Sequence, residues 1–219
     1  MVSNDNISAV LDILREYIKQ FQEPVVTQVS RKRDPFKVLI STVLSARTKD
    51  KVTKKAFERL MSRAETPEEI LILDNIEELI YPAGFYRTKA KNLKMLCTQL
   101  LEDFDGRVPD SLDDLLKLRG VGRKTANLVL VLAFDKEGVC VDTHVHRISN
   151  RWGYVSTKTP KKTEFALRKK LPKKHWKEYN DILVTFGQNL CKPRNPLCEK
   201  CPIAVYCSHY KKNKKRKKN

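Results

Sequence analysis

The apolar residues of this chain recur three and four positions apart, which is the spacing of one face of an α-helix. The clearest case is an N-terminal stripe, which consists of Ile7, Val10, Leu11, Leu14, Tyr17, Ile18 and Phe21. Pro24 follows this stripe and predicts the end of that helix. No alternating run of β-branched residues lies between hairpin-type turns, so no strand is predicted. The pattern therefore predicts an all-α fold.

Capping residues mark where further helices begin. Asp34 before Pro35 is a favourable N-cap and first helical residue. Thr66, followed by Pro67 and Glu69, has the form of a capping box. The helical pattern continues over residues 89–104, 143–151, 160–170 and 174–190.

A helix, a tight turn and a second helix are predicted within residues 112–134. Asp110 or Ser111 is the expected N-cap of the first helix. The turn consists of Leu118, Arg119, Gly120, Val121 and Gly122. The second helix, 125–134, is apolar nearly all round, which is typical of a helix at the centre of a domain.

The glycines of this turn suit a phosphate-binding hairpin. Glycine adopts positive φ easily and lets backbone amides approach an anion, and the N-terminus of the following helix adds unpaired N–H groups. Val121 between the glycines is expected to pin the two helices together. Gly-x-Gly alone also occurs in ordinary connections between helices, but the flanking residues make the phosphate interpretation more specific. The predicted contacts are Gly120, Val121, Gly122 and Arg123.

Lys124 lies in the first turn of the second helix, where the helix dipole disfavours a positive charge. Helix stability therefore does not explain this residue. A phosphate contact and a nucleophilic amine are the two interpretations. Asp142 follows eighteen residues later, and it is placed to cap the next helix or to stabilise a positive charge nearby.

Four of the six cysteines fall close together, and they are Cys191, Cys198, Cys201 and Cys207. Four thiolates in so short a segment need a metal to hold them, and both a zinc site and an iron–sulfur cluster are compatible with the residue types. The spacing does not decide between them. Lys192 and Arg194 lie between the first two cysteines and are expected to face phosphate. Cys97 and Cys140 have apolar neighbours and are predicted to be buried.

The charge balance points to a polyanionic partner. Lys and Arg number 44 against 26 Asp and Glu, which gives a net charge of +18. Seven of these charges lie in the tail 211–219, which we expect to be disordered, and the remainder of the chain keeps +11. No segment approaches the length of an apolar membrane span, and no signal peptide precedes the first helix. We expect an intracellular protein of the cytoplasm or nucleoid, with no membrane association.

Taken together, these segments resemble the endonuclease III family of the helix-hairpin-helix DNA glycosylase superfamily. The resemblance covers nearly the whole chain apart from the tail. It is carried by LRGVGRKTANLVL at 118–130, VDTHVHR at 141–147, LSARTKD at 44–50, GFYRTKAKN at 84–92 and the four cysteines.

This resemblance implies two helical lobes with a DNA-binding cleft between them. A six-helix lobe would span 28–136, with its hairpin near 112–134. The second lobe would combine 1–27 with 137–210 and hold a [4Fe–4S] cluster on the four cysteines, followed by the basic tail 211–219.

The resemblance also implies a bifunctional DNA glycosylase and AP lyase. Lys124 would form the Schiff base and Asp142 would stabilise the charge at the sugar C1′. The expected substrate is double-stranded DNA with oxidised pyrimidines such as thymine glycol, or with abasic sites, and the expected state is a monomer. The alternatives are a monofunctional mismatch glycosylase and a non-catalytic DNA-binding module whose four cysteines bind zinc.

Arg47 departs from the family pattern, because many relatives have Gln at this position. The resemblance implies that this residue fills the gap left by a flipped nucleotide, and that Phe85 is an apolar wedge entering the stack from the other side. An arginine would read the unpaired base differently, so the preference for the opposite base is left open.

Overall fold

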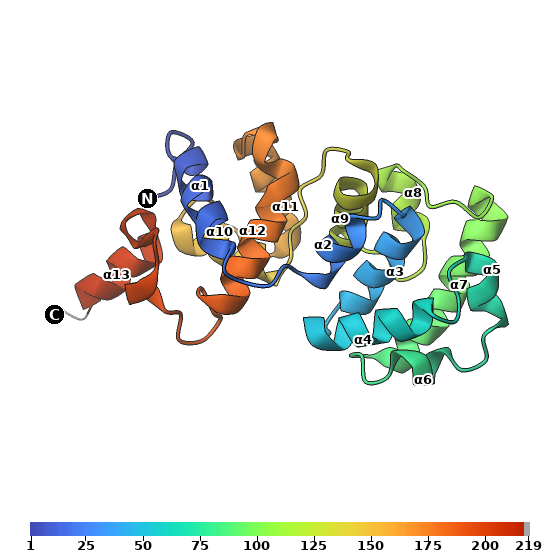
Figure 1. Ribbon diagram of the computed structural model, residues 1–219. Helices are drawn as coiled ribbons and strands as arrows, with labels where there is room; N and C mark the ends of the chain where they lie inside the picture. Colours follow the sequence, from blue (N-terminus) through green and yellow to red (C-terminus); the bar gives the residue numbers. More distant parts are fainter. Residues whose placement is uncertain (217–219) are drawn as a thin grey trace. The chain divides into compact units, whose positions relative to one another are not determined.

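The computed structural model describes residues 1–216, with side chains described to residue 214, and this part of the chain contains helices and no strands (Figure 1). The prediction of an all-α fold is confirmed. Contacts divide the chain into two units. One is Pro24–Lys136, and the other joins Met1–Glu23 to the chain from Glu137 onward.

The unit Pro24–Lys136 is built on α3 (Pro35–Ser45) and α9 (Arg123–Phe134), which are buried along most of their length. Contacts are densest between α3 and α9 and between α5 and α7. Every residue of α9 from Thr125 to Val131 is buried, as expected of the central helix. The helices are α2 (Val25–Ser30), α3 (Pro35–Ser45), α4 (Asp50–Met61), α5 (Pro67–Ile72), α6 (Ile76–Ile80), α7 (Tyr86–Phe104), α8 (Leu112–Lys117) and α9 (Arg123–Phe134).

Two features of this unit differ from expectation. The described chain holds eight helical segments here instead of six, because α2, α5, α6 and α8 are short elements of five or six residues. The unit also begins at Pro24 and not at residue 28. Val25 and Val26 are buried and α2 packs on α3, so burial draws these residues into this unit.

Helix starts follow the capping residues read from the sequence. The Asp34 carboxylate accepts a hydrogen bond of 3.0 Å from the backbone N–H of Lys37. Thr66 and Glu69 form the predicted capping box. Ser111, and not Asp110, caps α8 by accepting from the backbone N–H of Asp114.

The other unit is organised around α12, which packs against α1 and α10. Its core contains the large buried side chains Trp152, Tyr154, Tyr179 and Phe186. The elements are α1 (Ile7–Ile18), α10 (Thr143–Trp152), α11 (Pro160–Lys170), η1 (Lys173–His175), α12 (Trp176–Asn189), η2 (Cys198–Lys200), η3 (Ala204–Tyr206) and α13 (Ser208–Arg216).

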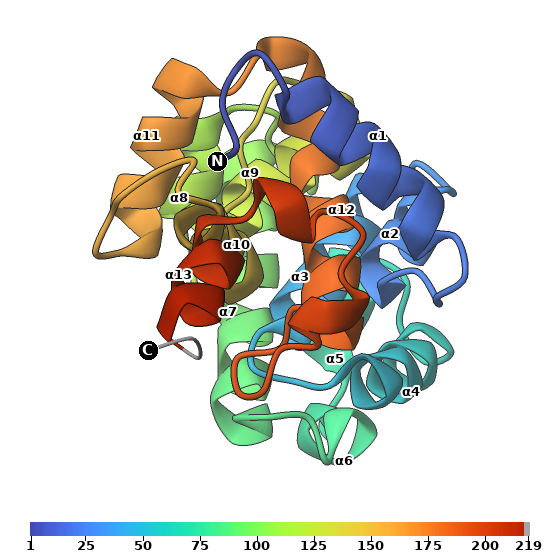
Figure 2. The ribbon, with the colours of Figure 1, turned by 90° about the vertical axis from the view of Figure 1, so that its left-hand side faces the viewer.

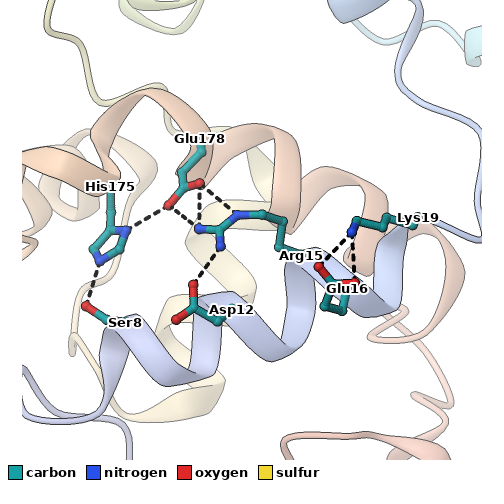
Figure 3. A network of polar contacts seen from close by, with 7 residues as sticks. All are labelled: Ser8, Asp12, Arg15, Glu16, Lys19, His175 and Glu178. Atoms are coloured by element: carbon teal, nitrogen blue, oxygen red, sulfur yellow. Dashed lines mark hydrogen bonds and ion pairs between the residues drawn. The ribbon is translucent and has the colours of Figure 1, made fainter.

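A polar network fixes α1 to α12, which lie side by side (Figures 2 and 3). The Arg15 guanidinium binds Asp12 at 2.6 Å and Glu178 at 2.9 Å. The buried His175 ring lies between the Ser8 hydroxyl at 2.9 Å and the Glu178 carboxylate at 2.7 Å. These contacts join the start of the chain to a helix more than 150 residues later.

The basic tail was expected to be disordered from residue 211, and this expectation is wrong for residues 211–216, which continue α13. Ser208 begins this helix and donates a hydrogen bond of 2.9 Å to the Trp152 carbonyl. Lysine has a favourable helix propensity, and nucleation is the costly step of helix formation. Because the start of α13 packs on α10, the lysines that follow need only to extend a helix that has already formed. Residues 217–219 lie outside the described residues.

Candidate functional site

The glycine hairpin lies between α8 and α9, as the sequence indicated. Gly120 has φ +79°, a left-handed conformation that favours glycine, and a Cβ there would lie 3.3 Å from the Asn92 side chain. Val121 is buried in the core of the unit and its N–H binds the Leu118 carbonyl. Gly122 is the N-cap of α9, and no described atom would lie within 4 Å of a Cβ there. Gly122 therefore leaves room for a partner to approach the backbone.

Arg123 and Lys124 are the first two residues of α9, and both are half-buried. Gly122 has no side chain to cap the helix, so the backbone N–H groups of the first turn are suited to an anion. Asn127 donates to the Arg123 carbonyl at 2.9 Å and tightens this turn. The hairpin thus places a primary amine beside an anion-binding helix end.

Asp142 is the N-cap of α10, which confirms the capping interpretation. One carboxylate oxygen accepts two hydrogen bonds of 2.8 Å, from the backbone N–H groups of His144 and Val145. The other oxygen is not used in these two bonds, and the side chain is half-buried. The structure therefore fixes a carboxylate in one orientation at a helix end. Lys124 and Asp142 belong to different units.

Arg47 and Phe85 come from separate segments, and the structure brings them together. The Arg47 guanidinium carbon lies 5.3 Å from the centre of the Phe85 ring. Both residues have positive φ, +52° and +57°, which costs free energy for residues other than glycine. The Phe85 side chain is 61% exposed. A large exposed aromatic ring beside a guanidinium is suited to stacking on a nucleobase.

The four clustered cysteines line one cavity at the C-terminal end of α12. Burial raises the pKa of the Cys201 thiol to about 12, and the charges of neighbouring thiols act in the same direction. Burial likewise raises the pKa of Cys198 and Cys207. Buried thiols of this kind need cations beside them to become thiolates. Cys97 and Cys140 are buried, as predicted.

The arrangement of the four thiols fits a multi-iron cluster. The four cysteines line one shared cavity, and four cysteine thiolates are the donor set that holds a [4Fe–4S] cube.

Two arginines of α10 hold the loop after Cys191, a role that was not predicted from the sequence. Arg151 donates to the carbonyls of Lys192 at 2.7 Å and Pro193 at 2.8 Å. Arg147 donates to the Cys191 carbonyl at 2.8 Å. Their spacing of four residues on one helix face is a signal that could have identified them. The loop presents exposed Lys192 and Arg194.

None of the helices in the described part of the chain is both long enough and apolar enough to span a membrane.

Comparisons with known proteins agree with this geometry. A family described as "HhH-GPD superfamily base excision DNA repair protein" matches residues 40–173, and the "Iron-sulfur binding domain of endonuclease III" matches residues 191–207. The chain is 47% identical to the endonuclease III of Thermotoga maritima, over 93% of this chain and 94% of that protein. It is 43% identical to the Bos taurus endonuclease III-like protein 1, over 78% of this chain and 58% of that protein.

Solved structures give the same result. A trapped covalent intermediate of endonuclease III with DNA has a TM-score of 0.86 and 35% identity, and the alignment covers 98% of this chain and all of that one. A thermostable thymine-DNA glycosylase has a TM-score of 0.82 and 28% identity over 95% of this chain and 98% of that one. The chain belongs to the endonuclease III family of the HhH-GPD superfamily, and it is a DNA-binding glycosylase of base excision repair with a [4Fe–4S] cluster.

Proposed function

We propose that this enzyme removes oxidised pyrimidines, thymine glycol among them, from double-stranded DNA and then cuts the abasic strand through a Schiff base on Lys124. The observation that carries the proposal is the place of this lysine. It is the second residue of α9, two positions after the last glycine of a hairpin suited to holding a phosphate.

The reaction begins when the neutral Lys124 Nζ attacks C1′ of the flipped nucleotide and the damaged base leaves with the glycosidic electron pair and a proton. The C1′–O4′ bond then breaks and O4′ leaves with its electron pair. One Nζ proton has gone to the departing base and the second passes to O4′, which leaves an imine between Nζ and C1′. The imine makes the C2′ proton acidic, and its removal expels the 3′ phosphate by β-elimination. Water finally hydrolyses the imine and frees the lysine. The Asp142 carboxylate stabilises the positive charge that develops at C1′.

DNA is held through three groups of residues. The hairpin Gly120–Val121–Gly122, through the backbone N–H groups of its two glycines and with the Arg123 side chain, binds one phosphate. Lys192 and Arg194 bind another from the loop after Cys191. The Arg47 and Phe85 side chains fill the space from which the nucleotide is flipped. A saturated base such as thymine glycol stacks poorly, so extruding it costs less.

Cys191, Cys198, Cys201 and Cys207 are the proposed ligands of the cluster, and the family match spans these four cysteines. When bound, the cluster holds the four thiolates in one place and so stabilises the loop that carries Lys192 and Arg194. We further propose that the enzyme acts as a monomer on DNA inside the cell.

One observation supports a second candidate function. The similarity to a thymine-DNA glycosylase at 28% identity is compatible with a monofunctional mismatch glycosylase, in which Lys124 only contacts phosphate. The similar structure of a trapped endonuclease III–DNA covalent intermediate favours the bifunctional reaction, because that protein forms a covalent bond with DNA.

The test is borohydride trapping on duplexes that carry thymine glycol or an abasic site. Wild-type protein is compared with Lys124→Ala and with Lys54→Ala, an exposed lysine on α4, as the control. We expect a covalent adduct and strand cutting with wild type and Lys54→Ala, and neither with Lys124→Ala. Base release without an adduct in the wild type would support the monofunctional reaction instead.

A further inference from the structure

Lys89 is an almost fully buried lysine, 6% exposed, in the first turn of α7. The positive end of a helix dipole is an unfavourable place for an ammonium group, and burial adds a desolvation cost. Burial lowers the pKa of this lysine to about 8. Some other interaction must therefore explain why a lysine stands here.

The Lys89 ammonium group binds three oxygen atoms of the chain 41 to 45 residues before it. It donates to the carbonyl of Leu44 at 2.6 Å, to the carbonyl of Ala46 at 2.7 Å and to the hydroxyl of Thr48 at 2.8 Å. The two carbonyls lie at the C-terminal end of α3, where helical carbonyls lack partners within the helix. All three N–H donors of the ammonium are therefore used.

These three acceptors surround Arg47. Leu44 and Ala46 precede it and Thr48 follows it, so the ammonium holds the turn that gives Arg47 its positive φ. The free-energy cost of the positive φ at Arg47 is offset by contacts around this turn, and Lys89 supplies three of these contacts.

The same anchor reaches the turn that carries Phe85. The Thr48 hydroxyl accepts a second hydrogen bond, of 3.0 Å, from the backbone N–H of Gly84. A Cβ at Gly84 would overlap the Arg47 carbonyl oxygen, so the two backbones are in direct contact and only glycine fits there. Phe85 itself has φ +57° and lies four residues before Lys89.

We infer that Lys89 is a positioning residue that holds the Arg47 turn and the Phe85 turn together, so that both side chains enter the DNA stack as one rigid pair. This inference rests on the proposed function, because it gives Arg47 and Phe85 their role in filling the flipped-out space. Lys89 does not touch DNA or the reacting atoms. It acts through the two side chains that do.

The test measures single-turnover base release from a thymine-glycol duplex by wild type, Lys89→Met and Lys89→Arg. Lys91→Met, an exposed lysine on the same helix, is the matched control. We expect Lys89→Met to slow release about 10- to 100-fold, since small misplacements of positioning groups have effects of that size. Lys89→Arg keeps the charge and restores most of the rate, and Lys91→Met stays within about twofold of wild type, as expected for an exposed position.

A double-mutant cycle separates positioning from a general loss of stability. In an Arg47→Ala/Phe85→Ala background, Lys89→Met should slow release by less than about threefold, because the groups it positions are gone. An equal loss in both backgrounds would overturn the inference. If Lys89→Met does not fold, Thr48→Val takes its place in the cycle, since it removes one acceptor of the same ammonium.

Hydrogen exchange tests the role of Lys89 in holding the two turns without relying on base release, so this inference and the proposed function can fail separately. In Lys89→Met, amide exchange should rise in residues 44–50 and 83–88 while α9 stays protected. If wild type releases no base, the proposed function fails and the exchange pattern alone decides whether Lys89 holds the two turns. Unchanged exchange in both segments, or unchanged base release by Lys89→Met, would contradict the inference.

Discussion

The turns that lead into α7 and α9 follow the same sequence pattern, but the first forms a contact within the protein and the second leaves a helix end open. Each helix follows a turn with a glycine, Gly84 or Gly122, and each carries a lysine in its first turn, Lys89 or Lys124. At Gly84 the space of a Cβ is occupied by the Arg47 backbone, whereas at Gly122 that space is open. Lys89 is buried and bound to three protein oxygens, whereas Lys124 is half-buried.

The difference shows that a glycine followed by a lysine does not by itself mark a ligand site. What occupies the space beside the glycine decides the outcome. Protein fills it before α7 and produces a structural anchor, while the open position before α9 leaves the helix end available to a phosphate.

The largest expected effect is at Lys124. Lys124→Gln should lower strand cutting at abasic sites by about a thousandfold or more, because it removes the nucleophile and leaves the fold intact. Thermal unfolding should shift by no more than a few degrees. A gel-based assay of strand cutting measures the first quantity and calorimetry the second. If Lys124→Gln cut the strand at the wild-type rate, Lys124 would not be the nucleophile and would not differ in this way from Lys89.

The two glycines should respond in opposite ways to the same substitution. Gly84→Ala should lower the free energy of unfolding by about 2–3 kcal/mol, because its Cβ meets backbone that has no room to move. Gly122→Ala should change it by less than about 1 kcal/mol, the usual size of an N-cap effect, but should weaken DNA binding. Urea unfolding and fluorescence anisotropy with duplex DNA measure the two effects. Equal destabilisation by both substitutions would remove the contrast.

The buried ammonium should make stability depend on alkaline pH. The pKa of Lys89 is about 8 in the fold against 10.5 for a free lysine, so the unfolded chain binds more protons between these values. The free energy of unfolding should therefore rise with pH from about 8 to about 10.5, by an amount on the order of 1–3 kcal/mol. Urea unfolding across this range, with Lys89→Met as the reference, measures the difference. If the difference in unfolding free energy between wild type and Lys89→Met did not change with pH over this range, the lowered pKa of Lys89 would be contradicted.

The smallest effect is expected at Thr48, whose hydroxyl serves both turns. Thr48→Val removes one acceptor from Lys89 and one from the Gly84 N–H, and should lower the free energy of unfolding by about 1–2 kcal/mol. Thr53→Val on α4 is the matched control, because its hydroxyl donates to the carbonyl of Lys49, the N-cap of the same helix. Thr48→Val should therefore be the more damaging of the two.

Local features of the fold could be predicted from the sequence because their causes are local. Asp34, Thr66 and Asp142 each cap a helix through N–H groups two or three residues away. The role of Lys89 could not be predicted in this way, since its acceptors lie more than forty residues earlier. The positive φ of Arg47 and Phe85 was also missed, because neither residue type favours that conformation. The predicted catalytic pair, the DNA contacts and the cluster ligands stay predictions until they are tested.

The network between α1 and α12 has a consequence for how the protein is made. Ser8 and His175 are 167 residues apart, so α1 makes this contact only after the chain has been synthesised as far as His175. The unit Pro24–Lys136 is one continuous segment, so its sequence is complete before His175 is added. Synthesis therefore completes the segment with the hairpin and its lysine before the unit with the clustered cysteines can join its two parts.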